Sequence, residues 1–169
     1  MNKSVRLLVF FLDAQRYALR LSGVERVVRA VTITPLPDAP ATVLGIINFQ
    51  GQIVPVINMR RCFGLPEQKI RISDQFIIVA TARQTFALAT DTVLGVIDCP
   101  VGVISARDIL PQMDRVEGAM ILADGMLLIS DIDKILSLGE EAALRGQLAG
   151  LGNLSPEVGG EFQGQANEP

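Results

Sequence analysis

One apolar stretch in the first half of the chain constrains the fold most strongly. In VLGIINFQGQIVPVINMRRCFG, residues 43–64, two β-branched runs flank a polar triplet centred on Gly51. This pattern predicts a tight β-hairpin with Gly51 at a positive φ angle. Pro55 has no N–H for the sheet ladder, so it predicts an edge position or a bulge. Residues 59–64 predict one helical turn that ends at Gly64.

The chain contains this design twice. VEGAMILADGMLLISDIDKIL, from Val116, aligns with the stretch from Val43, and glycine, apolar and helix-start positions coincide. Upstream, FALATDTVLGVI, from Phe86, aligns with YALRLSGVERVV, from Tyr17. The sequence therefore predicts two similar β-units. They cover residues 17–72 and 86–138.

The spacing of the apolar runs indicates the fold class. Each unit holds about five short strands, and short strands at this spacing favour small closed sheets, because closure removes exposed edges. We expect a mainly β fold in which two small, intertwined five-stranded barrels share an apolar interface over residues 4–139. Short helices are expected near residues 105–110 and 132–138. Residues 140–169 are expected to form a short helix and then a disordered tail.

The composition argues against an enzyme. The chain has no histidine, the side chain that most often serves as a general base at neutral pH. Asp131 and Asp133 form a close acidic pair, but residues two apart do not face one another on a helix, and Asp131 suits a helix cap. Cys62 and Cys99 lack metal-ligand spacing and predict buried thiols. We expect no catalysis, no cofactor and no metal.

The N-terminal residues predict a strand. No apolar run approaches the roughly 20 residues that span a bilayer. Residues 5–12 are apolar, but no small-residue cleavage site follows them, which argues against a signal peptide. The sequence thus predicts a cytoplasmic protein without direct membrane insertion.

Charge is divided unevenly along the chain. Residues 1–72 carry ten basic and four acidic residues, whereas residues 73–139 carry four basic and nine acidic ones. Such a split suggests complementary head-to-tail contacts between molecules, and two ordinary solvated faces are the alternative. Arg60 and Arg61 are interpreted as a solvated helical face, and Asp91 as a turn former. Nucleic acid is not expected as a partner, because the arginines do not cluster with stacking aromatic residues.

Three segments together resemble the CheW family of bacterial chemosensory adaptors. VLGIINFQGQIVPVINMRRCFGL resembles the family's hairpin, in which an Asn-x-Arg-Gly turn precedes an apolar run with proline and an Asn/Asp-x-Arg ending. VERVVRAVTITPLP resembles the segment before it, and DTVLGVI resembles an Asp-x-Val-x-x-Val piece of the second half. The resemblance covers about residues 4–139.

This resemblance implies a fold, a function and a site. Members fold as two five-stranded SH3-like barrels, have no catalytic activity, and bridge the cytoplasmic hairpin tip of chemoreceptors to the regulatory domain of the histidine kinase CheA. It implies a place in the cytoplasm at membrane-associated receptor arrays, and rings with that kinase domain to which copies of this chain could also contribute. The receptor is expected in a groove between the barrels. The positions carried over to this chain are Val24, Arg26, Gly45, Asn48, Gln50 and Gly51.

Two positions depart from the family pattern. Arg26 stands where the family has glutamate, and Gln50 stands where it has arginine before the hairpin glycine. Strand alternation would place Glu25 on the opposite face from Arg26, which makes Glu25 a poor substitute. The chain is therefore interpreted as a divergent member. An auxiliary scaffold of a non-standard chemosensory pathway and a small-ligand-binding barrel stay open as alternatives.

Structural roles are open for most of these positions. Gly51 could serve only the turn, and Gly45 only close backbone packing. Val24 could be a core residue, and Asn48 could satisfy loop backbone groups. Gln50 is the strongest functional candidate, because an exposed hairpin tip needs no glutamine to fold.

Overall fold

The computed structural model describes residues 4–100, 104–105 and 116–137, and within them the fold is mainly β. The elements follow in this order: β1 (Ser4–Leu12), β2 (Gln15–Arg20), the 3₁₀ turn η1 (Leu21–Gly23), β3 (Val24–Arg29), β4 (Val43–Phe49), β5 (Gln52–Ile57), α1 (Met59–Cys62), β6 (Gln75–Ala80), β7 (Thr85–Thr90), β8 (Thr92–Pro100), β9 (Ile104–Ser105), β10 (Val116–Leu122) and β11 (Gly125–Ser130). Residues 132–137 form a further short helix.

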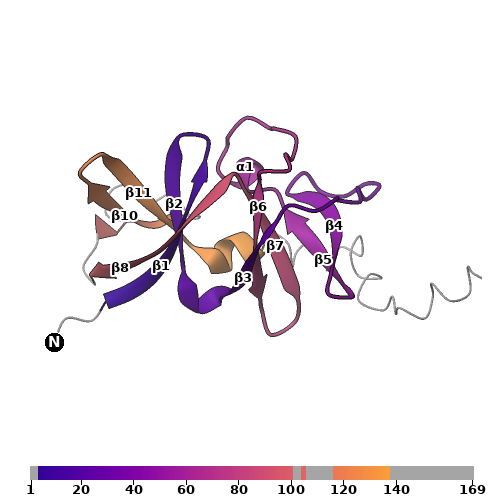
Figure 1. Cartoon of the computed structure of the whole chain (residues 1–169), viewed down its shortest axis with the longest axis horizontal. Coiled ribbons are helices and arrows are strands. Elements are labelled where there is room, and N and C mark those ends of the chain that lie inside the picture. The colour runs from indigo at the N-terminus through magenta and orange to yellow at the C-terminus, as the bar shows by residue number, and fades with distance from the viewer. Residues whose placement is uncertain (1–3, 101–103, 106–115, 138–169) are drawn as a thin grey trace, which may run out of the picture.

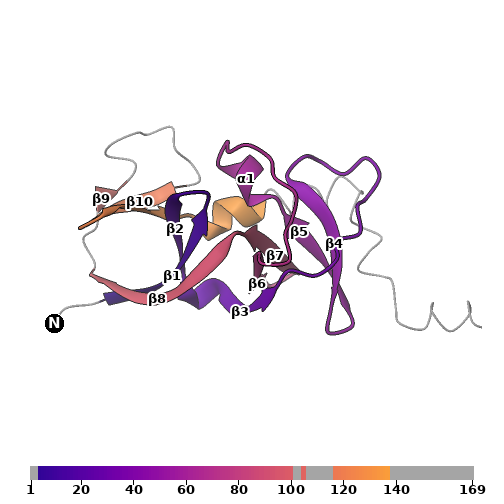
Figure 2. The same cartoon turned by 45° about the horizontal axis from the view of Figure 1, so that its top comes forward.

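The strands form two curved sheets that lie side by side (Figure 1). The first has the order β8-β1-β2-β11-β10-β9 and the second the order β3-β6-β7-β5-β4. In Figure 1 the first sheet lies on the left and the second on the right, with α1 and the helix of residues 132–137 between them. Figure 2 shows the two-residue β9 beside β10, at the end of the first sheet. Two small barrels with few short helices are therefore confirmed.

The repeat in the sequence is also a repeat in strand pairing. The β4–β5 ladder shifts register between Val43 and Gly45, and the β10–β11 ladder shifts between Val116 and Gly118. Each hairpin then joins its sheet through a parallel pair, β5 with β7 and β11 with β2. The first strand of each repeat, β2 or β7, thus lies in the sheet built mostly from the other repeat. Neither repeat can complete a sheet from its own strands.

The central strands are buried on both faces. Along β6, Phe76 and Ile78 point into the second barrel, whereas Ile77 and Val79 join a cluster between the barrels. Because both faces are covered, QFIIVA is continuously apolar rather than alternating. The barrel interiors hold separate clusters, Ile47, Val54, Val56, Phe76, Ile78, Ala87 and Ala89 in the second, and Leu7, Val9, Ala18, Cys99, Leu127 and Ile129 in the first.

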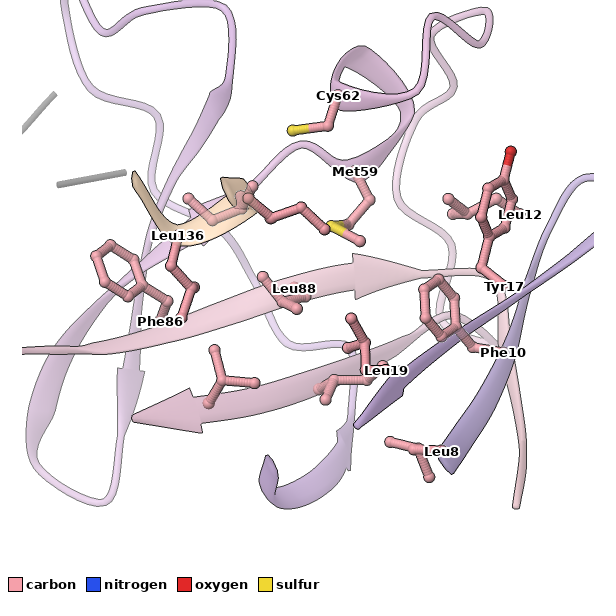
Figure 3. Close-up of a cluster of buried hydrophobic side chains, with 14 of the residues drawn as sticks. Leu8, Phe10, Leu12, Tyr17, Leu19, Met59, Cys62, Phe86, Leu88 and Leu136 are labelled. Carbon is pink, nitrogen blue, oxygen red and sulfur yellow. The ribbon is translucent and has the colours of Figure 1, made fainter. Parts of the chain in front are cut away.

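A shared core joins the two barrels. Figure 3 shows side chains from both sheets, from α1 and from the helix of residues 132–137 meeting there. The fully buried ones include Phe10, Leu12, Leu19, Ile57, Met59, Ile77, Phe86, Leu88 and Ile135. Burial of one large apolar side chain stabilises a fold by about 1.5–3 kcal/mol. The expected apolar interface is confirmed, and it makes the two barrels one packed body.

The predicted hairpin is confirmed, whereas the edge or bulge position predicted for Pro55 is wrong. Gln50 and Gly51 form its two-residue turn with φ angles of 52° and 81°, the positive pair that a type I′ turn requires. Pro55 is not on an edge strand, because β5 lies between β4 and β7. The pairing of β5 with β7 begins only at Val56. Pro55 therefore precedes the point where that second ladder starts.

The helical predictions have mixed outcomes. The turn over Met59–Cys62 and the helix near residue 132 are confirmed. The Asp131 carboxylate accepts the backbone N–H groups of Asp133 and Lys134, as a helix cap does. Ser105 belongs to β9 rather than to a helix. Residues 106–110 and 140–169, with the predicted helices and tail, lie outside the described residues.

Substitution of Gly45 by alanine should destabilise the fold strongly. Gly45 has a φ of 148°, and a Cβ there would lie 2.3 Å from the Thr34 carbonyl oxygen, which belongs to the segment that bridges to β4. We expect Gly45→Ala to lower the free energy of unfolding by about 2–5 kcal/mol, measured by denaturant titration. Gly51→Ala is the matched control, because no heavy atom lies within 4 Å of a Cβ there. Its expected cost is about 1–2 kcal/mol, and equal losses would contradict the packing role of Gly45.

Candidate functional site

A β-bulge shapes the first candidate segment. Val24 pairs with Val79 and Arg26 with Ile78, so Glu25 is an extra residue in β3. Side-chain alternation breaks down at a bulge, and Glu25 and Arg26 are both exposed. The simple alternation from which the separation of Glu25 and Arg26 was predicted is therefore interrupted at this point. Two opposite charges are adjacent and exposed on β3, and Arg26 pairs with Ile78, which points into the second barrel.

Arg26 reaches the β4–β5 hairpin. Its guanidinium carbon lies 5.7 Å from the centre of the Phe49 ring, over the ring face, a cation–π arrangement. Gln50 follows Phe49 at the exposed turn, and Asn48 precedes it on β4. We call these five residues, Glu25, Arg26, Asn48, Phe49 and Gln50, the tip surface.

The predicted site residues separate into two groups. Arg26, Asn48, Gln50 and Gly51 lie on or beside the tip surface, whereas Gly45 is buried beneath the Thr34 segment. Val24 is half-buried and packs against the shared core. The structure thus gives Gly45 and Val24 packing roles. It leaves Arg26 and Gln50 as the exposed side chains of the set without a structural hydrogen bond among the described residues.

Asn48 has a structural role as well. Its Oδ1 accepts a hydrogen bond from the Gly51 N–H at 3.0 Å, across the turn. Gln50 holds a φ of 52°, a conformation in which asparagine or glycine is more usual than glutamine. Turn formation alone therefore does not explain the glutamine.

A buried ion cluster was missed by the sequence interpretation. Arg60 is only 8% exposed, so its assignment to a solvated face is wrong. Its guanidinium donates to the Asp13 carboxylate at 2.7 Å and to both Asp91 carboxylate oxygens at 2.7 Å. Arg60 follows β5 of the second sheet, Asp13 lies in the β1–β2 turn of the first, and Asp91 lies between β7 and β8. The cluster therefore ties the two barrels together beside the shared core.

The charges of this cluster compensate one another. Burial by itself would lower the pKa of Arg60, but its hydrogen bonds to Asp13 and Asp91 outweigh burial and raise that pKa. The Asp13 N–H also donates a hydrogen bond to the Asp91 carboxylate at 2.8 Å. Asp13 itself has a positive φ of 55°. The partners of Arg60 are 47 and 31 residues away, so no local pattern could distinguish Arg60 from Arg61.

Part of the charge split of the sequence is satisfied within one molecule. Basic residues of β1 and β2 pair with acidic residues of the second half, because these strands share one sheet. The pairs are Arg6 with Asp98, Arg16 with Asp124 and Arg20 with Glu117. Hydrogen bonding to Arg16 lowers the pKa of Asp124. Exposed pairs of this kind add little stability, but they give the charge split an intramolecular explanation.

The described residues were compared with the requirements of a metal site, a membrane span and a reactive thiol. They contain no group of three or more histidine, cysteine, aspartate or glutamate side chains placed to hold a metal. No helix among them is long and apolar enough to cross a membrane. Cys62 and Cys99 are buried, as predicted. Burial raises the pKa of Cys99, partly offset by Arg20.

Comparison with known proteins identifies the family. The CheW-like domain profile matches residues 6–140. This chain belongs to the CheW family. It is 30% identical to the chemotaxis protein CheW of Thermotoga maritima over 137 residues, which cover 79% of this chain and 89% of that protein. It is 26% identical to CheW of Treponema pallidum over 151 residues, or 82% and 86% of the two chains.

The fold is that of a solved CheW protein. The crystal structure of the scaffolding protein TtCheW from Thermoanaerobacter tengcongensis matches with a TM-score of 0.68 at 30% identity, covering 76% of this chain and 90% of that one. The predicted resemblance is confirmed. CheW proteins are chemotaxis adaptors and not enzymes, and coupling receptors to CheA is their general role.

The Arg60 cluster should be a major contributor to stability. Arg60→Met would leave Asp13 and Asp91 close together without their cation, which should cost about 3–5 kcal/mol in denaturant unfolding. Arg61→Met is the matched control, since Arg61 is 53% exposed and lies 3.6 Å from Glu67. Its expected cost is below about 1 kcal/mol. Similar stabilities for the two variants would show that Arg60 does not tie the barrels together.

Proposed function

We propose that this chain is the cytoplasmic adaptor that couples the signalling hairpins of chemoreceptors to the regulatory domain of CheA at membrane-associated arrays. The observation that carries the proposal is a CheW fold packed as one body around a shared core. Such a body can hold two proteins in a fixed relation without any chemistry of its own. The exposed tip surface on the second barrel offers one docking place.

We propose the receptor hairpin as the occupant of the tip surface. Arg26, Gln50 and Asn48 are exposed there, and Gly51 makes the sharp turn that presents them. Val24 is half-buried and packs against the shared core, and the bulge at Glu25 separates it from Arg26.

The alternatives have weaker support. A small-ligand barrel needs interior space, whereas the described interiors are filled with apolar side chains such as Phe76, Ile78 and Leu127. An auxiliary scaffold of another chemosensory pathway would use the same fold and differ only in its partners. Self-association in rings stays a prediction. The charge split no longer supports it, because charges of the two halves pair within one molecule.

Co-sedimentation tests the proposal. The purified full chain is mixed with assembled receptor signalling hairpins and the CheA regulatory domain from the same genome. The wild type should appear in the pellet with both. Gln50→Trp should reduce receptor binding by about tenfold, because a bulky side chain at the turn obstructs docking, and should keep kinase binding.

A matched control uses Lys69→Trp. Lys69 is also exposed, but it lies in the loop after α1 and not in the β4–β5 hairpin. It should bind the receptor as the wild type does. If the folded wild type binds neither receptor nor kinase, the adaptor proposal fails; if both tryptophan variants behave alike, the receptor does not dock at the tip surface.

A further inference from the structure

We propose that Arg26, held on the face of Phe49, is a binding site for a carboxylate side chain of the docked protein. This inference rests on the proposed function and adds the chemistry of the partner: an aspartate or glutamate on the receptor hairpin must stand opposite Arg26.

The first step is the state of the arginine. Arg26 is exposed, and among the described residues it makes no hydrogen bond or ion pair. Its guanidinium carbon lies over the Phe49 ring, and no described group accepts a hydrogen bond from its N–H groups. Those N–H groups are the part of arginine that binds a carboxylate through two parallel hydrogen bonds.

The second step is preorganisation. A free arginine side chain loses much rotamer freedom when it binds. Contact with Phe49 restricts Arg26 beforehand, and Phe49 is itself half-buried against the interior cluster of the second barrel. The bulge at Glu25 sets the register in which Arg26 pairs with Ile78. Arg26 therefore lies on the same face of the sheet as the Phe49 side chain that it covers.

The third step is the local charge. The hairpin from Val43 to Ile57 contains no charged residue, so Arg26 is the cation of the tip surface. Its neighbour Glu25 is exposed too and would repel an acidic group placed on its own side. The two charges therefore favour a partner that presents its carboxylate toward Phe49 and a neutral or basic residue toward Glu25.

A binding titration with matched variants tests the inference. The full chain is titrated with the receptor signalling hairpin at low and high salt, and separately with the CheA regulatory domain. Arg26→Gln should weaken receptor binding about tenfold and reduce its salt dependence, while kinase binding is unchanged. Arg26→Lys keeps the charge but not the two-pronged geometry, and should recover only part of the loss.

Two further variants separate the roles. Phe49→Leu keeps Arg26 and should still weaken receptor binding about threefold, because the guanidinium is no longer held. Arg29→Gln is the control, since Arg29 is also exposed on β3 and should have no more than about a twofold effect. Circular dichroism and thermal unfolding confirm that each variant is folded.

Substitutions on the receptor hairpin complete the test. Single Glu→Gln and Asp→Gln changes on the receptor hairpin should include one that weakens the wild type but has no added effect on Arg26→Gln. If wild-type binding is intact and Arg26→Gln binds as tightly as Arg29→Gln, the carboxylate site is refuted while the adaptor proposal stands. If the wild type does not bind the receptor, the proposed function itself fails.

Discussion

The shared core between the barrels is the interaction on which the rest of the structure depends. Each barrel has its own small interior, but most of the largest buried side chains, Phe10, Phe86 and Met59 among them, meet between the sheets. Strands β1 and β6 are consequently apolar on both faces. A chain of this size gains much of its buried area from this one contact, so the two barrels are expected to fold and unfold together.

Exchange of strands between the repeats has consequences for charge. Because β2 lies beside β11 and β1 beside β8, basic residues of the first half meet acidic residues of the second half within one sheet. The Arg60 cluster also pairs charges that are far apart in the sequence. At the junction of the barrels, its guanidinium binds aspartates from two turns. Part of what looks in the sequence like two oppositely charged surfaces is therefore an internal arrangement.

Local patterns predicted the local structure. The duplicated hairpin, the positive φ at Gly51 and the helix near residue 132 followed from residue types and spacing. The resemblance to the CheW family predicted that the barrels are SH3-like. The burial of Arg60 and the exposure of Glu25 did not follow, because the first depends on partners far along the chain and the second on a bulge that interrupts alternation. At the candidate site, the cation–π contact of Arg26 with Phe49 joins β3 and β4, which follow one another in the sequence but are the two outermost strands of the second sheet.

Proteins of the CheW family are chemotaxis adaptors, and we propose that the two-barrel body of this chain holds its partners in a fixed relation, with the tip surface as one docking place. The most direct measurement is CheA autophosphorylation in membranes that contain the receptors of the same genome, with and without this chain. The account predicts that the chain raises kinase activity in the presence of receptors and makes it respond to receptor ligand. Unchanged activity, with the chain folded and both partners active, would contradict the account.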